Sequence, residues 1–169
     1  MVPLCKGIVL EIGAGSGLNF PLYDTNKVKK LYALEPDREM IKLARRETKE
    51  TPFKITYLQE YAEHISLKDN SVDTILLTYS LCTIPDPMSA LKEMKRTLKS
   101  NGRLIYCEHG MAPETSIKKW QDRLNPINSY FCGGCNLNRD ISRIIVESGF
   151  KIQKLETMYL PGTTKLIGY

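Results

Sequence analysis

Three glycines on alternate positions, Gly13, Gly15 and Gly17, follow an apolar run near the start of the chain. Glycine allows backbone turns with positive φ, and it lets a ligand approach the main chain closely. An apolar run that ends in such a turn before a helical stretch is typical of the cofactor cradle in open α/β sheets. The stretch from Val9 to Phe20 therefore predicts a cofactor-binding turn.

Two kinds of cofactor fit a turn of this type. A dinucleotide fingerprint needs a glycine at its sixth position, but Leu18 stands there and the third glycine comes one residue earlier. Glu11 precedes the turn, where a carboxylate opposes a pyrophosphate and suits an ammonium group. Glu35 follows about 20 residues beyond the turn, where a carboxylate accepts hydrogen bonds from ribose hydroxyls. Glu35 fits both cofactors, but Leu18 and Glu11 favour S-adenosylmethionine over NAD(P). An NAD(P)-dependent oxidoreductase is the alternative.

The elements that hold these residues alternate between strand and helix. Strand-like runs are expected at 7–13, 30–36, 53–59, 71–80, 103–109, 151–160 and 163–169. Helical stretches are expected at 18–23, at 37–50 with Asp37 as N-cap, at 87–102 with Gly102 as its end, and at 140–148. The pattern predicts a doubly wound, Rossmann-like α/β fold with a mostly parallel sheet of seven strands. The last strand is expected to be antiparallel, because Pro161 and Gly162 leave no room for a crossover.

Length and composition set limits on the class of protein. The 169 residues suit one domain, 1–169, in which the irregular stretch 110–139 is a substrate-binding insertion. The net charge of +5 is spread along the chain, which disfavours a nucleic-acid partner. Apolar runs fall short of the ~20 residues of a membrane span. Five cysteines without a secretory signal are expected to be reduced thiols in a cytoplasmic protein.

Longer segments resemble a known family. "LEIGAGSG", "ALEP" and "LKEMKRTLKSNGRLIY" resemble the class I S-adenosylmethionine-dependent methyltransferases, in the small-molecule branch called methyltransferase type 11 or UbiE-like. The segments "LCTIPDPMSALKEMKRTLKSNGRLIYCEHG" and "GGCNLNRD" resemble a methyltransferase-like group that methylates small alkyl thiols, with the similarity in "EH" and in "GCNL-R". The resemblance covers nearly the whole chain. It implies methyl transfer to a small-molecule acceptor with a thiol, oxygen or carbon nucleophile.

The resemblance also assigns residues to the cofactor. The turn would contact the methionine and ribose, Glu11 the ammonium and Glu35 the ribose hydroxyls. The full cofactor set is Glu11, Gly13, Ala14, Gly15, Gly17, Glu35, Pro36, Met40, Ala62, Glu63, Thr78 and Tyr79. One departure is Tyr61, which replaces an Asp that often contacts the adenine amine in the family. The stretch 78–87 also lacks the Asn/Asp-Pro-Pro-aromatic motif of enzymes that methylate exocyclic or amide nitrogens.

The acceptor site is predicted from fewer residues. His109 is expected at the end of a strand, as a general base for a thiol or phenol or as a partner of a loop carbonyl. Trp120, Tyr130 and Phe131 are expected to line an apolar acceptor pocket or to form the core of the insertion. Cys132 to Cys135 read as ordinary loop thiols, because further ligands at zinc-site spacing are missing, so no metal is predicted.

Only Met1 to Lys6 precede the first strand, so the amino-terminal helices of the family are largely missing. Three explanations remain open: an open cofactor cleft, a cleft covered by a partner subunit in a homodimer, or a shortened chain. The sequence carries no hydrophobic anchor there, and no membrane attachment is expected. A non-catalytic protein that binds S-adenosylmethionine is the remaining alternative to an enzyme.

Overall fold

A parallel sheet forms the centre of the first of two compact units in the computed structural model. The structure describes residues 1–47 and 51–169. The first unit contains Met1–Thr78 and Ser89–Cys107, and the second contains Tyr79–Met88 and Glu108–Tyr169. The single domain over 1–169 stays a prediction.

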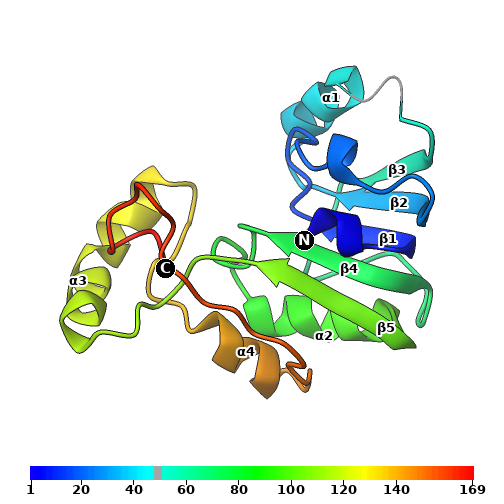
Figure 1. The fold of residues 1–169 in the computed structure, drawn as a ribbon. Helices are drawn as coiled ribbons and strands as arrows, with labels where there is room; N and C mark the ends of the chain where they lie inside the picture. The colour runs from blue at the N-terminus through cyan, green and yellow to red at the C-terminus, as the bar shows by residue number, and fades with distance from the viewer. Residues whose placement is uncertain (48–50) are drawn as a thin grey trace. The chain divides into compact units, whose positions relative to one another are not determined.

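The strands of the first unit confirm the parallel α/β prediction. Within the described residues the sheet has five strands in the order β3-β2-β1-β4-β5, and every neighbouring pair is parallel (Figure 1). The strands are β1 (Gly7–Ile12), β2 (Val28–Leu34), β3 (Lys54–Leu58), β4 (Val72–Thr78) and β5 (Leu98–Cys107). The chain runs outward from β1 to β3 and then returns to add β4 on the other side of β1. Ligands of open α/β sheets bind at the carboxyl ends of the strands beside such a reversal.

The central strands are buried on both faces, as parallel strands covered on both sides must be. Ile75, Leu76 and Leu77 in β4 are fully buried, and so are Val9 and Leu10 in β1. Burying a large aliphatic side chain stabilises the fold by about 1.5–3 kcal/mol. This apolar centre holds the carboxyl end of β1, and with it the glycine turn, in a fixed place.

Short helices precede the first strand or connect the strands of this unit. They are η1 (Val2–Leu4), η2 (Phe20–Leu22), α1 (Arg38–Glu47) and α2 (Pro87–Thr97), which begins in the second unit. Asp37 accepts a hydrogen bond of 2.7 Å from the N–H of Glu39, which confirms it as the N-cap of α1. In α1 the buried side chains are Ile41 and Ala44, whereas Met40 is exposed.

The predicted end of α2 at Gly102 is wrong. The helix ends at Thr97, and Gly102 lies inside β5. The backbone N–H groups of Asn70 and Ser71 donate to the carbonyls of Arg96 and Thr97, at 3.0 and 2.8 Å. These bonds satisfy carbonyls at the helix end, and the next residue already pairs with β4.

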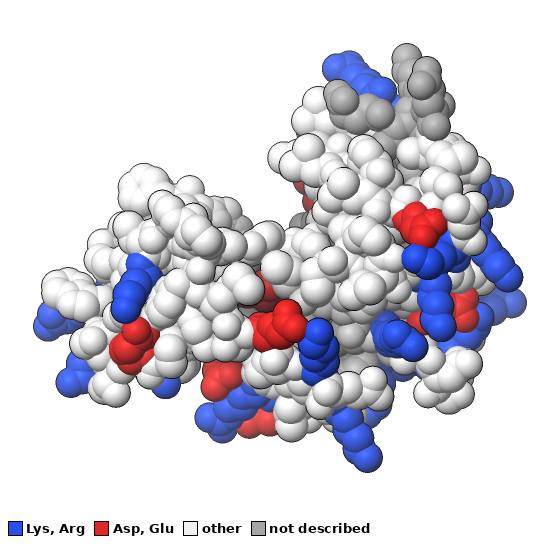
Figure 2. Space-filling view, in the orientation of Figure 1, with Lys and Arg blue, Asp and Glu red and all other residues white. Residues whose placement is uncertain are grey.

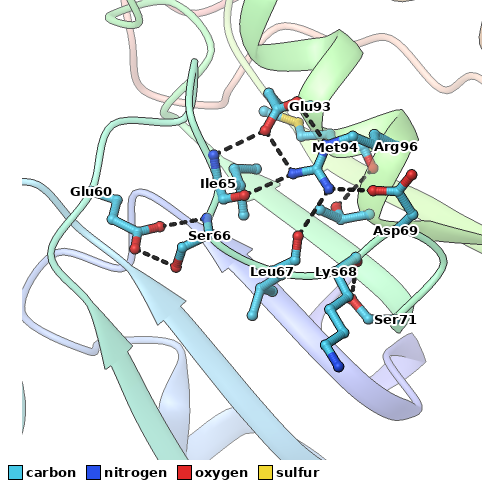
Figure 3. Close-up of polar contacts among 11 residues, drawn as sticks. Glu60, Ile65, Ser66, Leu67, Lys68, Asp69, Ser71, Glu93, Met94 and Arg96 are labelled. Carbon is cyan, nitrogen blue, oxygen red and sulfur yellow. Dashed lines mark hydrogen bonds and ion pairs between the residues drawn. The ribbon is translucent and has the colours of Figure 1, made fainter.

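Arg96 joins the end of α2 to the loop before β4 (Figure 3). Its guanidinium donates to both carboxylate oxygens of Glu93, at 2.8 and 2.7 Å. It also donates to the carbonyls of Ile65 and Leu67, at 2.7 and 2.9 Å, and to the carboxylate of Asp69. The pairing with Arg96 lowers the pKa of Glu93 to about 2. This cluster fixes the crossover between β3 and β4.

The second unit is built on α3 (Thr115–Phe131) and α4 (Ile141–Glu147). The predicted last helix is confirmed, because Asp140 caps α4 by accepting from the N–H of Arg143 at 3.1 Å. Gly149 follows the helix with φ of 88°, a conformation that suits glycine at a helix end. The longer α3 contains Pro126, and its buried Gln121 accepts from the N–H of Ala112 at 2.9 Å.

The predicted sixth and seventh strands are not confirmed, nor is the antiparallel last strand. Residues 151–169 form turns and irregular structure, and most of their side chains are exposed. Some of their hydrogen bonds close local turns, such as Gly168 N–H to Thr164 carbonyl at 3.0 Å, and the carbonyl of Tyr169 accepts from the N–H of Gly110 at 2.7 Å. The carbonyl of Leu166 accepts from the Gln121 side chain at 3.0 Å. Alternating residues in this stretch resembled a strand, but no sheet ladder pairs with them in the described part of the chain.

The charged surface is mixed. On the face shown in Figure 2, Lys and Arg side chains are interspersed with Asp and Glu. Among the helices that the structure describes, none combines the length and apolar character needed to cross a membrane.

Candidate functional site

The glycine turn directly follows β1, as predicted. Gly15 and Gly17 have φ of 53° and 84°, a region that side chains with a Cβ rarely adopt. A Cβ on Gly17 would lie 2.8 Å from the Phe20 ring, so this glycine is required by packing. A Cβ on Gly15 would meet no described atom within 4 Å, so the turn presents bare main chain to open space there. Such a turn can receive a ligand against its backbone.

Glu35, just beyond the end of β2, fixes this turn from the neighbouring strand. Its Oε2 accepts a hydrogen bond of 2.9 Å from the N–H of Gly15, and its Oε1 accepts one of 3.0 Å from the N–H of Asp37. The carbonyl of Leu34 accepts from the N–H groups of Gly13 and Ala14, at 2.9 and 3.0 Å. An ionised carboxylate has further lone pairs, so Glu35 can also accept from ligand hydroxyls.

Glu11 is fully buried in β1 beneath the turn. Its two oxygens accept from the amide of Asn19 at 2.7 Å and from the hydroxyl of Tyr23 at 2.8 Å. Burial raises the pKa of Glu11 to about 7, although both hydrogen bonds act in the opposite direction. The Asn19 amide also donates to the hydroxyl of Thr78 at the end of β4, at 2.8 Å. A chargeable group therefore lies at the switch point between β1 and β4.

Sequence reasoning missed Asn19 and Tyr23. Both follow the glycine turn at positions where only a short polar helix was expected. A signal was available, because a carboxylate predicted to be buried in a strand requires hydrogen-bond donors nearby. The residues between the turn and β2 were the nearest candidates.

The remaining predicted cofactor residues of the first unit follow β2 and β3. Pro36 and Met40 are exposed around the start of α1. After β3, Ala62 is buried, Glu63 is half-buried, and Tyr61 is 65% exposed. The carboxyl ends of parallel neighbours lie along one edge of the sheet, so these residues share an edge with the glycine turn.

In the second unit His109 lies beside two thiols. Its Nε2 is 3.2 Å from the Sγ of Cys135, and one ligand atom each from Cys82, His109 and Cys135 lie within 4.8 Å of one another. The Nδ1 of His109 is buried and has no hydrogen-bond partner among the described residues. Tyr79, with φ of 52°, stacks on the imidazole with ring centroids 6.1 Å apart. Burial lowers the pKa of His109, so the ring is neutral at pH 7.

Buried charged groups hold the segments that carry this cluster. Glu108 accepts from the N–H groups of Ser80 and Leu81, at 2.9 and 3.0 Å. Arg139 donates to the carbonyls of Leu81 and Ile84, at 2.5 and 2.7 Å. Burial raises the pKa of Glu108 and lowers that of Arg139, as expected for charges withdrawn from water. Both residues therefore stabilise the backbone around Cys82 through hydrogen bonds.

The aromatic residues predicted for the acceptor pocket all lie on α3. Trp120, Tyr130 and Phe131 are 55%, 83% and 78% exposed, so they are not the core of the insertion. Trp120 lines a surface pocket with neighbours of α3 and lies against the guanidinium of Arg123. Tyr130 and Phe131 contact each other edge to face with centroids 5.1 Å apart. Their role in acceptor binding stays a prediction.

Comparisons with known proteins agree with this fold. A family model for a methyltransferase domain of type 11 matches residues 10–106, more than half of the chain. A rat relative, thiol S-methyltransferase TMT1B, is 29% identical over 153 residues, which is 88% of this chain and 62% of the relative. The chain therefore spans less than two thirds of that protein.

Two solved structures are also similar. The YcgJ protein of Bacillus subtilis has a TM-score of 0.73 at 23% identity, over 92% of this chain and 66% of that one. An S-adenosylmethionine-dependent methyltransferase of Thermotoga maritima has a TM-score of 0.65 at 27% identity, over 88% of this chain and 66% of that one. The first likeness shows the fold, and the second supports S-adenosylmethionine as cofactor. The chain belongs to the type 11 family of methyltransferase domains.

Proposed function

We propose that this chain is an S-adenosylmethionine-dependent methyltransferase that acts on a small-molecule thiol. The observation that carries the proposal is the pair of carboxylates at the glycine turn. Glu11 lies buried beneath the turn, and Glu35 is hydrogen-bonded to its middle glycine. A carboxylate at Glu11 opposes a pyrophosphate and suits an ammonium group, whereas Glu35 suits the ribose hydroxyls that S-adenosylmethionine shares with NAD. S-adenosylmethionine carries both of these groups and no phosphate.

In this proposal the bare turn from Gly13 to Gly17 contacts the aminoacyl end and the ribose. Glu11, whose oxygens also accept from Asn19 and Tyr23, provides the negative charge for the ammonium group through a bridging water. Glu35 accepts from the ribose hydroxyls while it keeps its bond to the turn.

The adenine is assigned to residues that follow β2 and β3. Pro36 and Met40 are exposed, which leaves their apolar atoms available to a base. The backbone of Ala62 or the side chain of Glu63 is proposed to contact the adenine amine, since Tyr61 replaces the Asp that often does so in the family. Thr78 is assigned to the methionine. Tyr79 as a cofactor contact stays a prediction.

The acceptor chemistry is assigned to the second unit. Methyl transfer is an in-line displacement: a lone pair of the acceptor sulfur forms the new S–CH3 bond as the sulfonium C–S bond breaks. S-adenosylhomocysteine leaves as a neutral thioether, and the thiol proton must depart before or during attack. His109, a neutral imidazole beside two thiols, is the residue proposed to activate the acceptor sulfur for attack. The names of the relatives, thiol S-methyltransferases from rat and human, support a thiol as acceptor.

The wall of the acceptor site is proposed to include the exposed aromatic residues of α3. Large exposed aromatic side chains offer apolar area at low entropic cost. A small alkyl thiol presents an apolar body, which suits such a wall. Trp120, Tyr130 and Phe131 are the candidates.

Transfer of a labelled methyl group from S-adenosylmethionine to a panel of alkyl thiols, phenols and quinol precursors tests this function. We expect turnover with alkyl thiols and less with phenols. Binding of S-adenosylhomocysteine without turnover across the panel would instead favour a non-catalytic binding protein. Binding of NAD without binding of S-adenosylhomocysteine would reverse the cofactor assignment.

A further inference from the structure

Cys82, His109 and Cys135 come from three separate segments and meet in the second unit. Cys82 follows β4, His109 follows β5, and Cys135 lies between α3 and α4. They are 26 or more positions apart in sequence, yet one ligand atom from each lies within 4.8 Å of the others. A tetrahedral zinc ion holds two thiolates about 3.8 Å apart, and a thiolate and an imidazole nitrogen about 3.6 Å apart. In the observed cluster the thiol of Cys135 and the Nε2 of His109 are 3.2 Å apart and the other distances are at most 4.8 Å, so small side-chain movements would reach that geometry.

We propose that these three residues bind a thiophilic divalent cation, with Zn²⁺ as the ion best suited to two thiolates and one imidazole. The donor set excludes Mg²⁺ and Ca²⁺, which take oxygen ligands. Structural zinc sites have four protein ligands, whereas catalytic sites have three and keep one position open. Within the described residues no fourth Cys, His, Asp or Glu joins the cluster. The site is therefore of the open type.

The surroundings of the cluster support a binding site rather than an ordinary core. The backbone carbonyl of Cys82 accepts two hydrogen bonds from Asn136, one from its N–H and one from its side-chain amide, both of 3.0 Å. Arg139 and Glu108 hold the residue just before Cys82. Metal ligands are fixed in this way by outer hydrogen bonds, and loss of such partners typically weakens binding about 10–100-fold.

His109 adds an independent observation. Its ring has one nitrogen against a thiol and the other, Nδ1, buried without a described partner. A cation in this cluster would be held by the lone pair of Nε2, the nitrogen that faces the Sγ of Cys135, and Nδ1 would then carry the ring proton.

The charges within the site balance. Two thiolates cancel the charge of a divalent cation, and one basic and one acidic side chain, Arg139 and Glu108, hold the backbone of Leu81 nearby. Cys132 does not belong to the site, although it forms the CGGC motif with Cys135: its side chain is exposed. The pair of cysteines that matters is therefore 82 and 135.

The open position gives the cation a role in the proposed function, on which this part of the inference rests. An acceptor R–SH binds through sulfur and loses its proton to solvent water, so that it is held as a thiolate. The thiolate lone pair then forms the S–CH3 bond as the sulfonium C–S bond breaks. The thioether product is a weaker ligand than the thiolate and departs. His109 then acts as a ligand and not as a base.

Titration of the metal-free, reduced protein with Co²⁺ tests the site without reference to activity. We expect one Co²⁺ per chain, with a thiolate-to-cobalt charge-transfer band in the near ultraviolet. Cys82→Ser, Cys135→Ser and His109→Gln should each weaken Co²⁺ binding at least about 100-fold, since each removes a ligand itself rather than an outer partner. Cys132→Ser and Cys5→Ser are the controls, an exposed neighbour in the motif and a buried thiol of the first unit. Both should bind Co²⁺ like the parent protein.

Circular dichroism and S-adenosylhomocysteine binding show whether each variant is folded. Absence of stoichiometric Co²⁺ binding by the folded parent protein would overturn the inference. The inference would also be overturned if Cys132→Ser lost as much Co²⁺ binding as the three ligand variants. A further contrary result would be a protein that forms a Cys82–Cys135 disulfide and, after reduction, takes up no metal.

Propanethiol tests the open position. It should shift the cobalt charge-transfer band, and metal removal should abolish its methylation until Zn²⁺ is restored. If S-adenosylhomocysteine does not bind, the proposed function fails while the cobalt result stands. If the cofactor binds and propanethiol is methylated equally well without metal, the role of the cation fails while the proposed function stands.

Discussion

Glu35 holds Gly15 in place through a hydrogen bond of 2.9 Å from the glycine N–H to Oε2. The two residues lie 20 positions apart, at the carboxyl ends of neighbouring strands. The same carboxylate that shapes the glycine turn is thus the one proposed to bind the ribose. This double role makes Glu35 a sensitive point for cofactor binding.

Replacement of Glu35 should weaken S-adenosylhomocysteine binding measured by calorimetry. A hydrogen bond to a charged group contributes about 1.5–3 kcal/mol, so Glu35→Ala should weaken binding about 10–100-fold. Glu35→Gln, which keeps one carbonyl acceptor, should cost less. Glu39→Gln, in the first turn of α1, is the control and should bind as the parent does. Equal affinity in Glu35→Ala and the parent would contradict the assignment.

The pKa of Glu11, raised to about 7 by burial, predicts two pH effects. Because only the ionised carboxylate attracts an ammonium group, S-adenosylhomocysteine binding should strengthen as the pH rises through about 7. Glu11→Gln should flatten this dependence. Calorimetry between pH 6 and pH 8.5 checks it, and an unchanged pH profile in Glu11→Gln would argue against a charge-based role.

The stability of the ligand-free protein should change in the opposite direction. Between the unfolded pKa of 4.5 and the folded value of about 7, the folded state binds more protons than the unfolded state. Stability attributable to Glu11 therefore falls as the pH rises through this window, by up to about 3 kcal/mol. Urea unfolding at pH 8 should find Glu11→Gln more stable than the parent. A less stable variant at pH 8 would show that hydrogen bonds to the carboxylate outweigh its burial.

Gly15 and Gly17 should respond differently to alanine. Both have positive φ, which costs an alanine about 1–2 kcal/mol. Gly17→Ala adds a clash with Phe20, so its loss of stability in urea should be the larger of the two. Gly15→Ala should remain folded but lose affinity for S-adenosylhomocysteine, because its methyl group projects where the ligand is proposed to lie. A folded Gly15→Ala variant with parental affinity would place the ligand elsewhere.

Arg96 should be the most important surface cation of the first unit for stability. Arg96→Met removes hydrogen bonds to two carboxylates and two carbonyls, and should cost about 2–3 kcal/mol in urea unfolding. Arg143→Met, which breaks an exposed ion pair with Glu147 on α4, should cost less than about 1 kcal/mol.

The low pKa of Glu93 adds a test of how stability depends on pH. The stability that the ionised Glu93 gains from Arg96 should be fully present above pH 4.5 and should disappear as the pH falls towards 2. The stability of the Arg96→Met variant should not fall in this way over the same pH range.

The predictions that the structure confirms came from local sequence patterns. The glycine turn, the parallel strands β1 to β4 and the N-cap Asp37 all depend on neighbouring residues, whose types alone limit the backbone. The end of α2 failed because it is set by pairing with residues before β4, which no helix signal within the segment reveals. The closing strands failed because alternation of apolar residues does not supply a partner strand.

The cysteine cluster was invisible for a similar reason. Zinc sites are recognised in sequence by ligands at short spacings, and the CGGC motif drew attention to Cys132. The structure instead brings Cys135 to His109 and Cys82, which only the fold places together. The segments of His109 and Cys135 did stand out, since "EH" and "GCNL-R" are the parts that resemble the thiol-methylating group.

The most direct measurement is the binding of S-adenosylhomocysteine and of NAD to the parent protein and to Gly15→Ala, by isothermal titration calorimetry. We predict stoichiometric binding of the homocysteine nucleoside to the parent protein, much weaker binding to Gly15→Ala, and no response to NAD. Tight binding of NAD would contradict the proposal that a phosphate-free cofactor lies on this turn. Equal affinity of the homocysteine nucleoside for the parent protein and for Gly15→Ala would contradict it too.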